Sequence, residues 1–139
     1  MLSTFSPTKF KKDLKRGSVF EDFVADYFQK RGWTVKRAKG NIPAYDLILT
    51  KDRSSIYVEV KFDELSDRTQ NYCLEQASLE HTQSQVLIIG TPQEAYAVSM
   101  EDARKLFNQF PHRQTGDLPW NFSALVPKQV FQLNGYQRL

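Results

Sequence analysis

The chain has 139 residues, of which 40% are hydrophobic and 25% are charged, and this composition is ordinary for a single globular domain. The single cysteine, Cys73, excludes an internal disulfide framework. No apolar run approaches the roughly 18 residues of a membrane-spanning helix, and the N-terminus lacks the apolar block of a secretory signal. We therefore expect a cytoplasmic protein without a membrane partner.

The net charge of +3 is unevenly distributed along the chain. Basic residues crowd the first forty positions, where only four acidic residues oppose them. This pattern suits binding to a polyanion such as nucleic acid, and it equally suits a solvated surface that keeps the protein in solution. The basic residues are Lys9, Lys11, Lys12, Lys15, Arg16, Lys30, Arg31, Lys36, Arg37 and Lys39.

The first predicted element is an amphipathic helix over residues 17–32. Ser18 is placed to cap its start, with Glu21 three residues later as the partner in a capping box, and Gly32 is placed to end it. The apolar residues recur at the spacing of one helix face. They are Phe20, Phe23, Val24, Tyr27 and Phe28.

The following segments predict a sheet and a second helix. Residues 46–50 and 56–62 read as strands joined by a polar hairpin turn, and residues 86–90 read as a strand buried on both faces. Residues 63–71 read as a polar loop. Further short extended pieces are expected at 33–39, 71–77 and 94–99, a helix at 100–110, and a strand or short helix at 124–133.

This order predicts an α/β or α+β fold in which helices flank a mixed central β-sheet, and we expect the α/β class. We expect one domain over residues 1–139, with a basic N-terminal arm, a core over about 17–107 and a C-terminal tail.

Charged residues interrupt the most strand-like part of the sequence. Because side chains alternate along a strand, Tyr57, Glu59 and Lys61 share one face, with Glu59 and Lys61 about 6–7 Å apart. If the hairpin forms, Asp46 lies near the same end of the sheet. Two carboxylates supply the oxygen ligands that Mg²⁺ prefers, and a neighbouring lysine can orient water or stabilise charge on a phosphate. The alternative is a salt ladder on a solvated sheet face.

The combination of Asp46 with Glu59-Val60-Lys61 resembles the PD-(D/E)XK nuclease superfamily, including its small resolvase-like and phage-encoded members. The usual Pro-Asp is replaced here by Pro43-Ala44-Tyr45-Asp46. The resemblance covers about residues 17–107 and implies a restriction-endonuclease-like fold.

The resemblance also implies residue roles. Asp46 and Glu59 would bind Mg²⁺ or Mn²⁺ together with the carbonyl of Val60, and Lys61 would be the catalytic lysine. Glu21 would be an accessory metal ligand, unless it serves the capping box. Glu75 and Gln76 are candidates for contact with the lysine or DNA, or else form an exposed strand end. Candidate nucleic-acid contacts are Lys12, Lys15, Arg16, Lys36, Lys39, Arg68, Asn71 and Gln76.

These roles imply a metal-dependent DNA endonuclease, in which water attacks the scissile phosphate and expels the 3′-oxygen. Its substrate would be double-stranded or branched DNA, with a structure-specific enzyme of the Holliday-junction-resolvase kind as one form, and cutting both strands would require a homodimer. The alternative is a catalytically silent nucleic-acid-binding module that keeps the nuclease scaffold.

Overall fold

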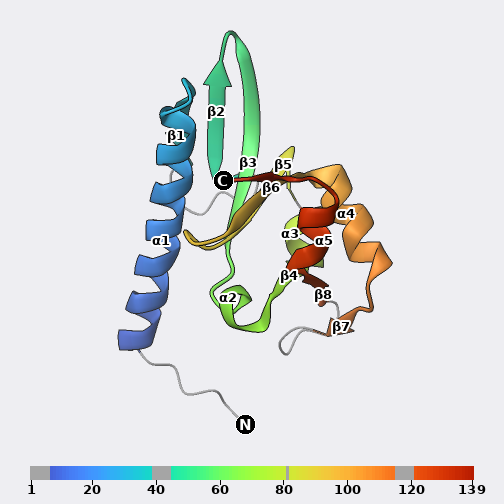
Figure 1. Cartoon of the computed structure of the whole chain (residues 1–139). Helices are drawn as coiled ribbons and strands as arrows, with labels where there is room; N and C mark the ends of the chain where they lie inside the picture. The colour runs from blue at the N-terminus through green and yellow to red at the C-terminus, as the bar shows by residue number, and fades with distance from the viewer. Residues whose placement is uncertain (1–6, 39–44, 81, 115–120) are drawn as a thin grey trace.

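The computed structural model describes residues 7–38, 45–80, 82–114 and 121–139, with residues 7–15 described by their backbone alone. Helix α1 lies on one side of a six-stranded sheet, and the other helices and a small second sheet lie on the opposite side (Figure 1). The elements in chain order are α1 (Pro7–Gln29), β1 (Thr34–Arg37), β2 (Leu47–Lys51), β3 (Ser54–Phe62), α2 (Ser66–Thr69), β4 (Asn71–Glu75), α3 (Gln76–Glu80), β5 (Val86–Gly90), β6 (Ala95–Ser99), α4 (Met100–Gln109), β7 (Arg113–Gln114), β8 (Phe122–Pro127), α5 (Lys128–Leu133) and β9 (Gln137–Arg138).

The main sheet is mixed, as the sequence predicts. Its strand order is β1-β2-β3-β5-β6-β9, and β3 pairs parallel with β5 while the other neighbours pair antiparallel. The second sheet has the order β4-β8-β7. This arrangement is a mixed α/β fold in which β3 is central and its side chains face two different layers.

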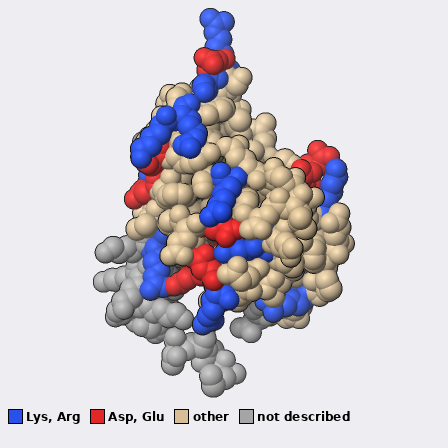
Figure 2. Space-filling view, viewed as in Figure 1, with Lys and Arg blue, Asp and Glu red and all other residues tan. Residues whose placement is uncertain are grey.

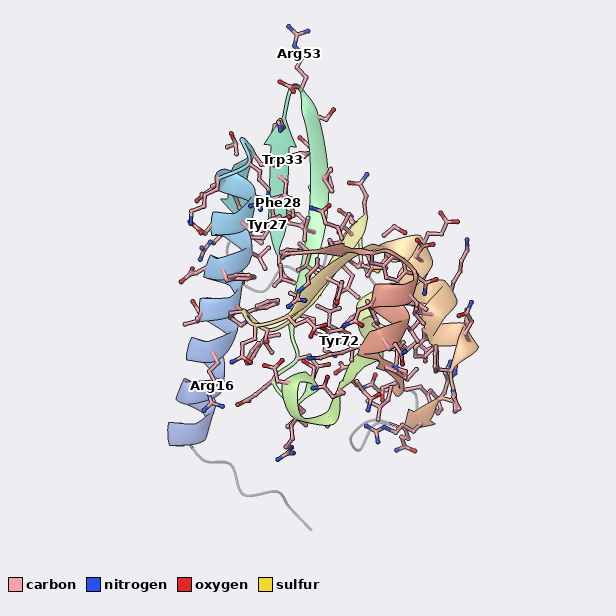
Figure 3. The ribbon with its side chains drawn as sticks, viewed as in Figure 1. Arg16, Tyr27, Phe28, Trp33, Arg53 and Tyr72 are labelled. Carbon is pink, nitrogen blue, oxygen red and sulfur yellow. The ribbon has the colours of Figure 1, made fainter. Side chains whose placement is uncertain are left out.

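Helix α1 ends as its sequence predicts. The N–H of Trp33 donates to the carbonyl of Phe28 and the N–H of Gly32 donates to that of Gln29, which is the double hydrogen bond of a Schellman motif. Gly32 has a φ of +90°, a conformation that favours glycine. The rings of Phe28 and Trp33 also meet edge to face at 6.4 Å (Figure 3). This end fixes the direction in which the chain enters β1.

The start of α1 differs from the prediction. The helix begins at Pro7, ten residues before the expected start, since proline is well suited to a first helical turn and the following residues favour helix. Ser18 therefore lies in the helix interior, so the capping-box interpretation of Glu21 is wrong. The side chain of Glu21 therefore takes no part in a helix cap.

The predicted hairpin between β2 and β3 is confirmed. Lys51 pairs with Ser54, so the loop consists of Asp52 and Arg53 alone. Both residues have positive φ, 51° and 70°, which is the geometry of a tight turn that matches strand twist. Figure 1 shows the hairpin projecting beyond the rest of the molecule, with Arg53 at its tip in Figure 3.

Two hydrophobic cores lie on opposite faces of the main sheet. Alternation along β5 sends Ile88 toward α1 and sends Leu87 and Ile89 toward the second sheet and α4. Strand β5 is thus buried on both faces, as its continuous apolar sequence predicts. On the α1 side the fully buried residues include Phe20, Val24, Leu47 and Val58; on the other side they include Tyr72, Leu74, Ala124, Val126 and Phe131.

Two segments after β3 are more ordered than the sequence suggests. The expected loop 63–71 contains α2, in which Ser66 is fully buried and its hydroxyl donates to the carbonyl of Asp63 at 2.7 Å. The segment 124–133 forms both alternatives, since it contains most of β8 and then α5, and these two elements complete the second core. None of the helices in the described parts of the chain has the length and hydropathy to cross a bilayer.

Two glycine substitutions test this packing. Gly90 has a φ of +141°, and an added Cβ would lie 2.2 Å from the carbonyl oxygen of Glu94, so we expect Gly90→Ala to lower the free energy of unfolding by at least about 2 kcal/mol. Gly17 lies inside α1 with open space around it, so Gly17→Ala should raise stability by about 0.5–1 kcal/mol. Urea denaturation measures both, and a neutral Gly90→Ala would contradict the geometry at the end of β5.

Candidate active site

The hairpin register brings Asp46 to Glu59. Leu47 lies opposite Val58, and the N–H of Asp46 donates to the carbonyl of Val58 at 2.9 Å, so the residue before β2 reaches the position beside Glu59. The side chain of Asp46 is fixed as well, because its Oδ2 accepts a hydrogen bond from the N–H of Val60 at 2.7 Å. Both carboxylates therefore meet at the base of the hairpin.

The electrostatics of Glu59 reflect this crowding. Burial, followed by the negative charge of Asp46, raises the pKa of Glu59 to about 7, and a hydrogen bond from Thr82 and the charge of Lys61 limit this rise. Burial also raises the pKa of Asp46, against the lowering effect of the Val60 hydrogen bond. The folded chain thus disfavours a second negative charge at this point.

Glu21 contributes a third carboxylate from α1. Its pKa is raised by burial and then by the charge of Asp46, and it is lowered by Arg37. Arg37 lies 4.0 Å from Glu21 through Nε and 2.6 Å from Asp22 through Nη2. Glu21 is therefore within electrostatic reach of Asp46, although it comes from the opposite layer of the fold.

Lys61 is held by an acid from the second sheet. Its Nζ donates to Oε1 of Glu75 at 2.6 Å, with 20% of the lysine side chain and 34% of the glutamate side chain exposed. Of the two alternatives for Glu75, contact with the lysine is the one observed. Gln76, the first residue of α3, instead donates from Nε2 to Glu80 at 2.9 Å.

Asp63 is a further acid near Lys61 and Glu75, and the sequence pattern alone does not single it out. Its Oδ2 accepts from the N–H of Cys73 at 2.8 Å, and its pKa is raised mainly by burial, with Lys61 and Glu75 among the charges that act on it. Asp63 continues the alternation of Tyr57, Glu59 and Lys61, and that spacing is the signal that could have found it.

The donor set suits a hard cation. Asp46, Glu59 and Glu21 carry carboxylate oxygens, the ligand type that such a cation prefers, and burial is the main cause that raises the pKa of each. Within the described ranges, no group of three or more Asp, Glu, His or Cys side chains lies close enough together to hold a metal ion. Asp46 and Glu59 are the carboxylates that could share an ion such as Mg²⁺, which keeps several of its waters and needs few protein ligands.

The candidate nucleic-acid contacts are spread over several elements. Arg16 is ion-paired with Glu64, and the Asn71 amide donates to the carbonyl of Thr69 at 3.0 Å. Lys36 on β1 and Arg68 on α2 are exposed. Lys12 and Lys15 lie in the part of α1 that is described by its backbone alone, and Lys39 lies outside the described residues.

Basic and acidic side chains are mixed on the molecular surface. On the face shown in Figure 2, Lys and Arg side chains alternate with Asp and Glu and do not form one continuous basic patch. The basic character of the first forty residues is thus partly offset by local ion pairs such as Arg37 with Asp22 and Lys30 with Asp26.

The fold and the comparison with family models define a nuclease domain of the PD-(D/E)XK superfamily. The chain belongs to the restriction endonuclease family Mrr_cat, whose model matches residues 15–105. Comparison with curated protein sequences gives no match.

Solved structures of nucleases share the fold. A bacterial homing endonuclease matches with a TM-score of 0.57 and 15% identity, covering 81% of this chain and 72% of that one. The Holliday junction resolvase Hjc of Archaeoglobus fulgidus matches with a TM-score of 0.55 and 15% identity, covering 88% of this chain and 91% of that one. At these identities the likeness concerns the fold alone.

The carboxylate crowding predicts an unusual pH dependence. Since the pKa of Glu59 is about 7 when folded and about 4.5 when unfolded, folded protein holds this proton more tightly, and stability should fall as pH rises between these values. We expect Glu59→Gln to remove this loss and to be more stable than the wild type above pH 7, by roughly 1–2 kcal/mol after solvent screening.

The measurement is urea denaturation at pH 5 and pH 8 in buffer free of divalent cations. Glu101→Gln is the matched control, because Glu101 is 78% exposed on α4. If the free energy of unfolding changes equally with pH in the wild type and in Glu59→Gln, the ionisation of Glu59 does not lower the stability of the fold, and the prediction is wrong.

Proposed function

We propose that the chain is a metal-dependent DNA endonuclease that hydrolyses phosphodiester bonds. The observation that carries the proposal is the pairing of Asp46 with Glu59 at the base of the hairpin, with Lys61 on the same face of β3. Membership of a restriction endonuclease family supports nucleic-acid hydrolysis as the reaction class.

Asp46 and Glu59 would hold the metal, Mg²⁺ or Mn²⁺, with the carbonyl of Val60 and with Glu21 as an accessory ligand. When bound, the ion supplies positive charge opposite the scissile phosphate and makes a water more acidic. The protein fixes Asp46 in advance through the Val60 N–H, so the side chain needs no reordering. Ionised carboxylates that repel one another gain from a cation between them.

Lys61 would act on the phosphate. Its ammonium group lies on the strand face that carries Glu59, and its charge acts on that carboxylate. The contact with Glu75 at 2.6 Å limits the positions open to a long, flexible side chain. The ammonium would then donate to a phosphate oxygen or orient the attacking water, which expels the 3′-oxygen and leaves a 5′-phosphate.

The proposed substrate is double-stranded or branched DNA, including junctions. Lys36 and Arg68 are exposed and would contact the phosphate backbone, which positions a substrate without reading its sequence. Each chain has a single set of Asp46, Glu59 and Lys61, so cutting both strands would require two copies, and we propose a homodimer.

A cleavage panel tests the proposed activity. Wild-type protein with Mg²⁺ or Mn²⁺ should cut at least one of supercoiled plasmid, four-way junction, flap and single-stranded DNA. We expect Glu59→Gln and Lys61→Ala to lower the rate at least about 100-fold, because the first removes a charged metal ligand and the second removes the cation that would act on the phosphate.

The control is Lys105→Ala, which removes a lysine that is 65% exposed on α4, and it should cleave like the wild type. Full inactivity of the wild type on all four substrates, with either metal, would favour a silent DNA-binding module. Undiminished cleavage by Lys61→Ala would show that Lys61 takes no part in the reaction.

A further inference from the structure

One face of the hairpin is open to solvent and continuous with the candidate active site. Strand register sets Lys36 of β1 opposite Ile48 of β2, and Ile48 opposite Tyr57 of β3, so the three side chains form a row across the sheet. Tyr57 and Glu59 alternate on the same face, about 6–7 Å apart along the strand. The row therefore borders the carboxylates directly.

The two faces of the hairpin have different surroundings. Leu49 and Ile56 point toward α1 and belong to the core there, together with Phe28 and Trp33. On the other face, Lys36 is exposed and Tyr57 is 36% exposed, although tyrosine is a large and mostly apolar residue. Figure 1 shows why, since the hairpin extends past the helices that cover this side of the main sheet.

Tyr57 has an aromatic neighbour at the entry to the site. Its ring lies 5.0 Å from that of Tyr45, with an angle of 49° between the ring planes. Tyr45 directly precedes Asp46 in the chain. Among the described residues, neither tyrosine is a member of the two buried core clusters. The pair thus adds little to the packing that holds the domain together.

We infer that Tyr57, supported by Tyr45, stacks on an unpaired nucleobase of the strand that is cleaved, with Lys36 contacting its backbone. Exposed aromatic rings and nearby cations together are a common means of binding single-stranded nucleic acid, because every base offers a flat face and every phosphate a negative charge. A base inside a duplex is already stacked and cannot use the ring. This inference rests on the proposed function and narrows its substrates to DNA with unpaired bases beside the cut.

The test measures binding apart from cleavage. The protein carries Glu59→Gln and is kept in chelator, and fluorescence anisotropy gives the dissociation constant for three DNAs. These are a blunt duplex, the same duplex with a single-stranded thymidine extension, and one whose extension is abasic.

We expect the thymidine extension to bind more tightly than the abasic one. Tyr57→Ala should weaken binding to the thymidine extension by roughly 5- to 100-fold and leave duplex binding unchanged. Tyr57→Phe keeps the ring and should keep the affinity. Leu133→Ala, which alters a residue that is 77% exposed on α5, is the matched control and should bind like the parent.

Equal binding of thymidine and abasic extensions would overturn the inference, as would a Tyr57→Ala variant that keeps the preference for thymidine. If circular dichroism shows that Tyr57→Ala is poorly folded, the comparison of the thymidine and abasic extensions in the parent protein still tests the inference. Lack of cleavage by the wild type would contradict the proposed endonuclease alone, because this assay does not involve turnover.

Discussion

The hydrogen bond from the N–H of Val60 to Asp46, 2.7 Å long, is the interaction on which the candidate site depends. It ties the residue before β2 to the middle of β3 and presents one carboxylate beside another. Burial and the charge of Asp46 together raise the pKa of Glu59 to about 7, so the folded chain retains an electrostatic cost at this point. A cation that binds between the two side chains would offset that cost.

The surrounding fold stabilises β3 enough to offset the unfavourable placement of Glu59 beside Asp46. The α1 layer buries Val58 fully on the face of β3 opposite Glu59, and β5 pairs with β3 while its own side chains enter both cores. The backbone of β3 is thus fixed by apolar burial and by hydrogen bonds on both edges. Charged groups can then converge on the remaining part of one face without disrupting the strand.

Sequence periodicity predicts the parts of the fold that have local causes. The hairpin, the doubly buried β5 and the glycine-terminated end of α1 follow from alternation, apolar runs and Gly32. The start of α1 at Pro7 differs from the prediction because Ser18 and Glu21 have the spacing of a capping box but lie inside the helix. The order in residues 63–71 does not follow from local sequence, because it depends on the burial of Ser66 and on Lys128 from α5, whose Nζ lies 3.2 Å from Oδ1 of Asp67.

The same distinction applies to the site. Asp46, Glu59 and Lys61 are recognisable because their spacing lies within one hairpin. The contact of Lys61 with Glu75 joins two different sheets, and the approach of Glu21 to Asp46 joins two layers, so neither follows from local spacing. The open face with Lys36 and Tyr57 requires the register of three strands.

The most direct test of the central claim is an anomalous-scattering map from crystals soaked in Mn²⁺. The shared carboxylate site predicts a strong peak bound by both Asp46 and Glu59, and its loss in Glu59→Gln crystals. A map in which manganese is absent from this position, or is held only by residues elsewhere, would contradict it.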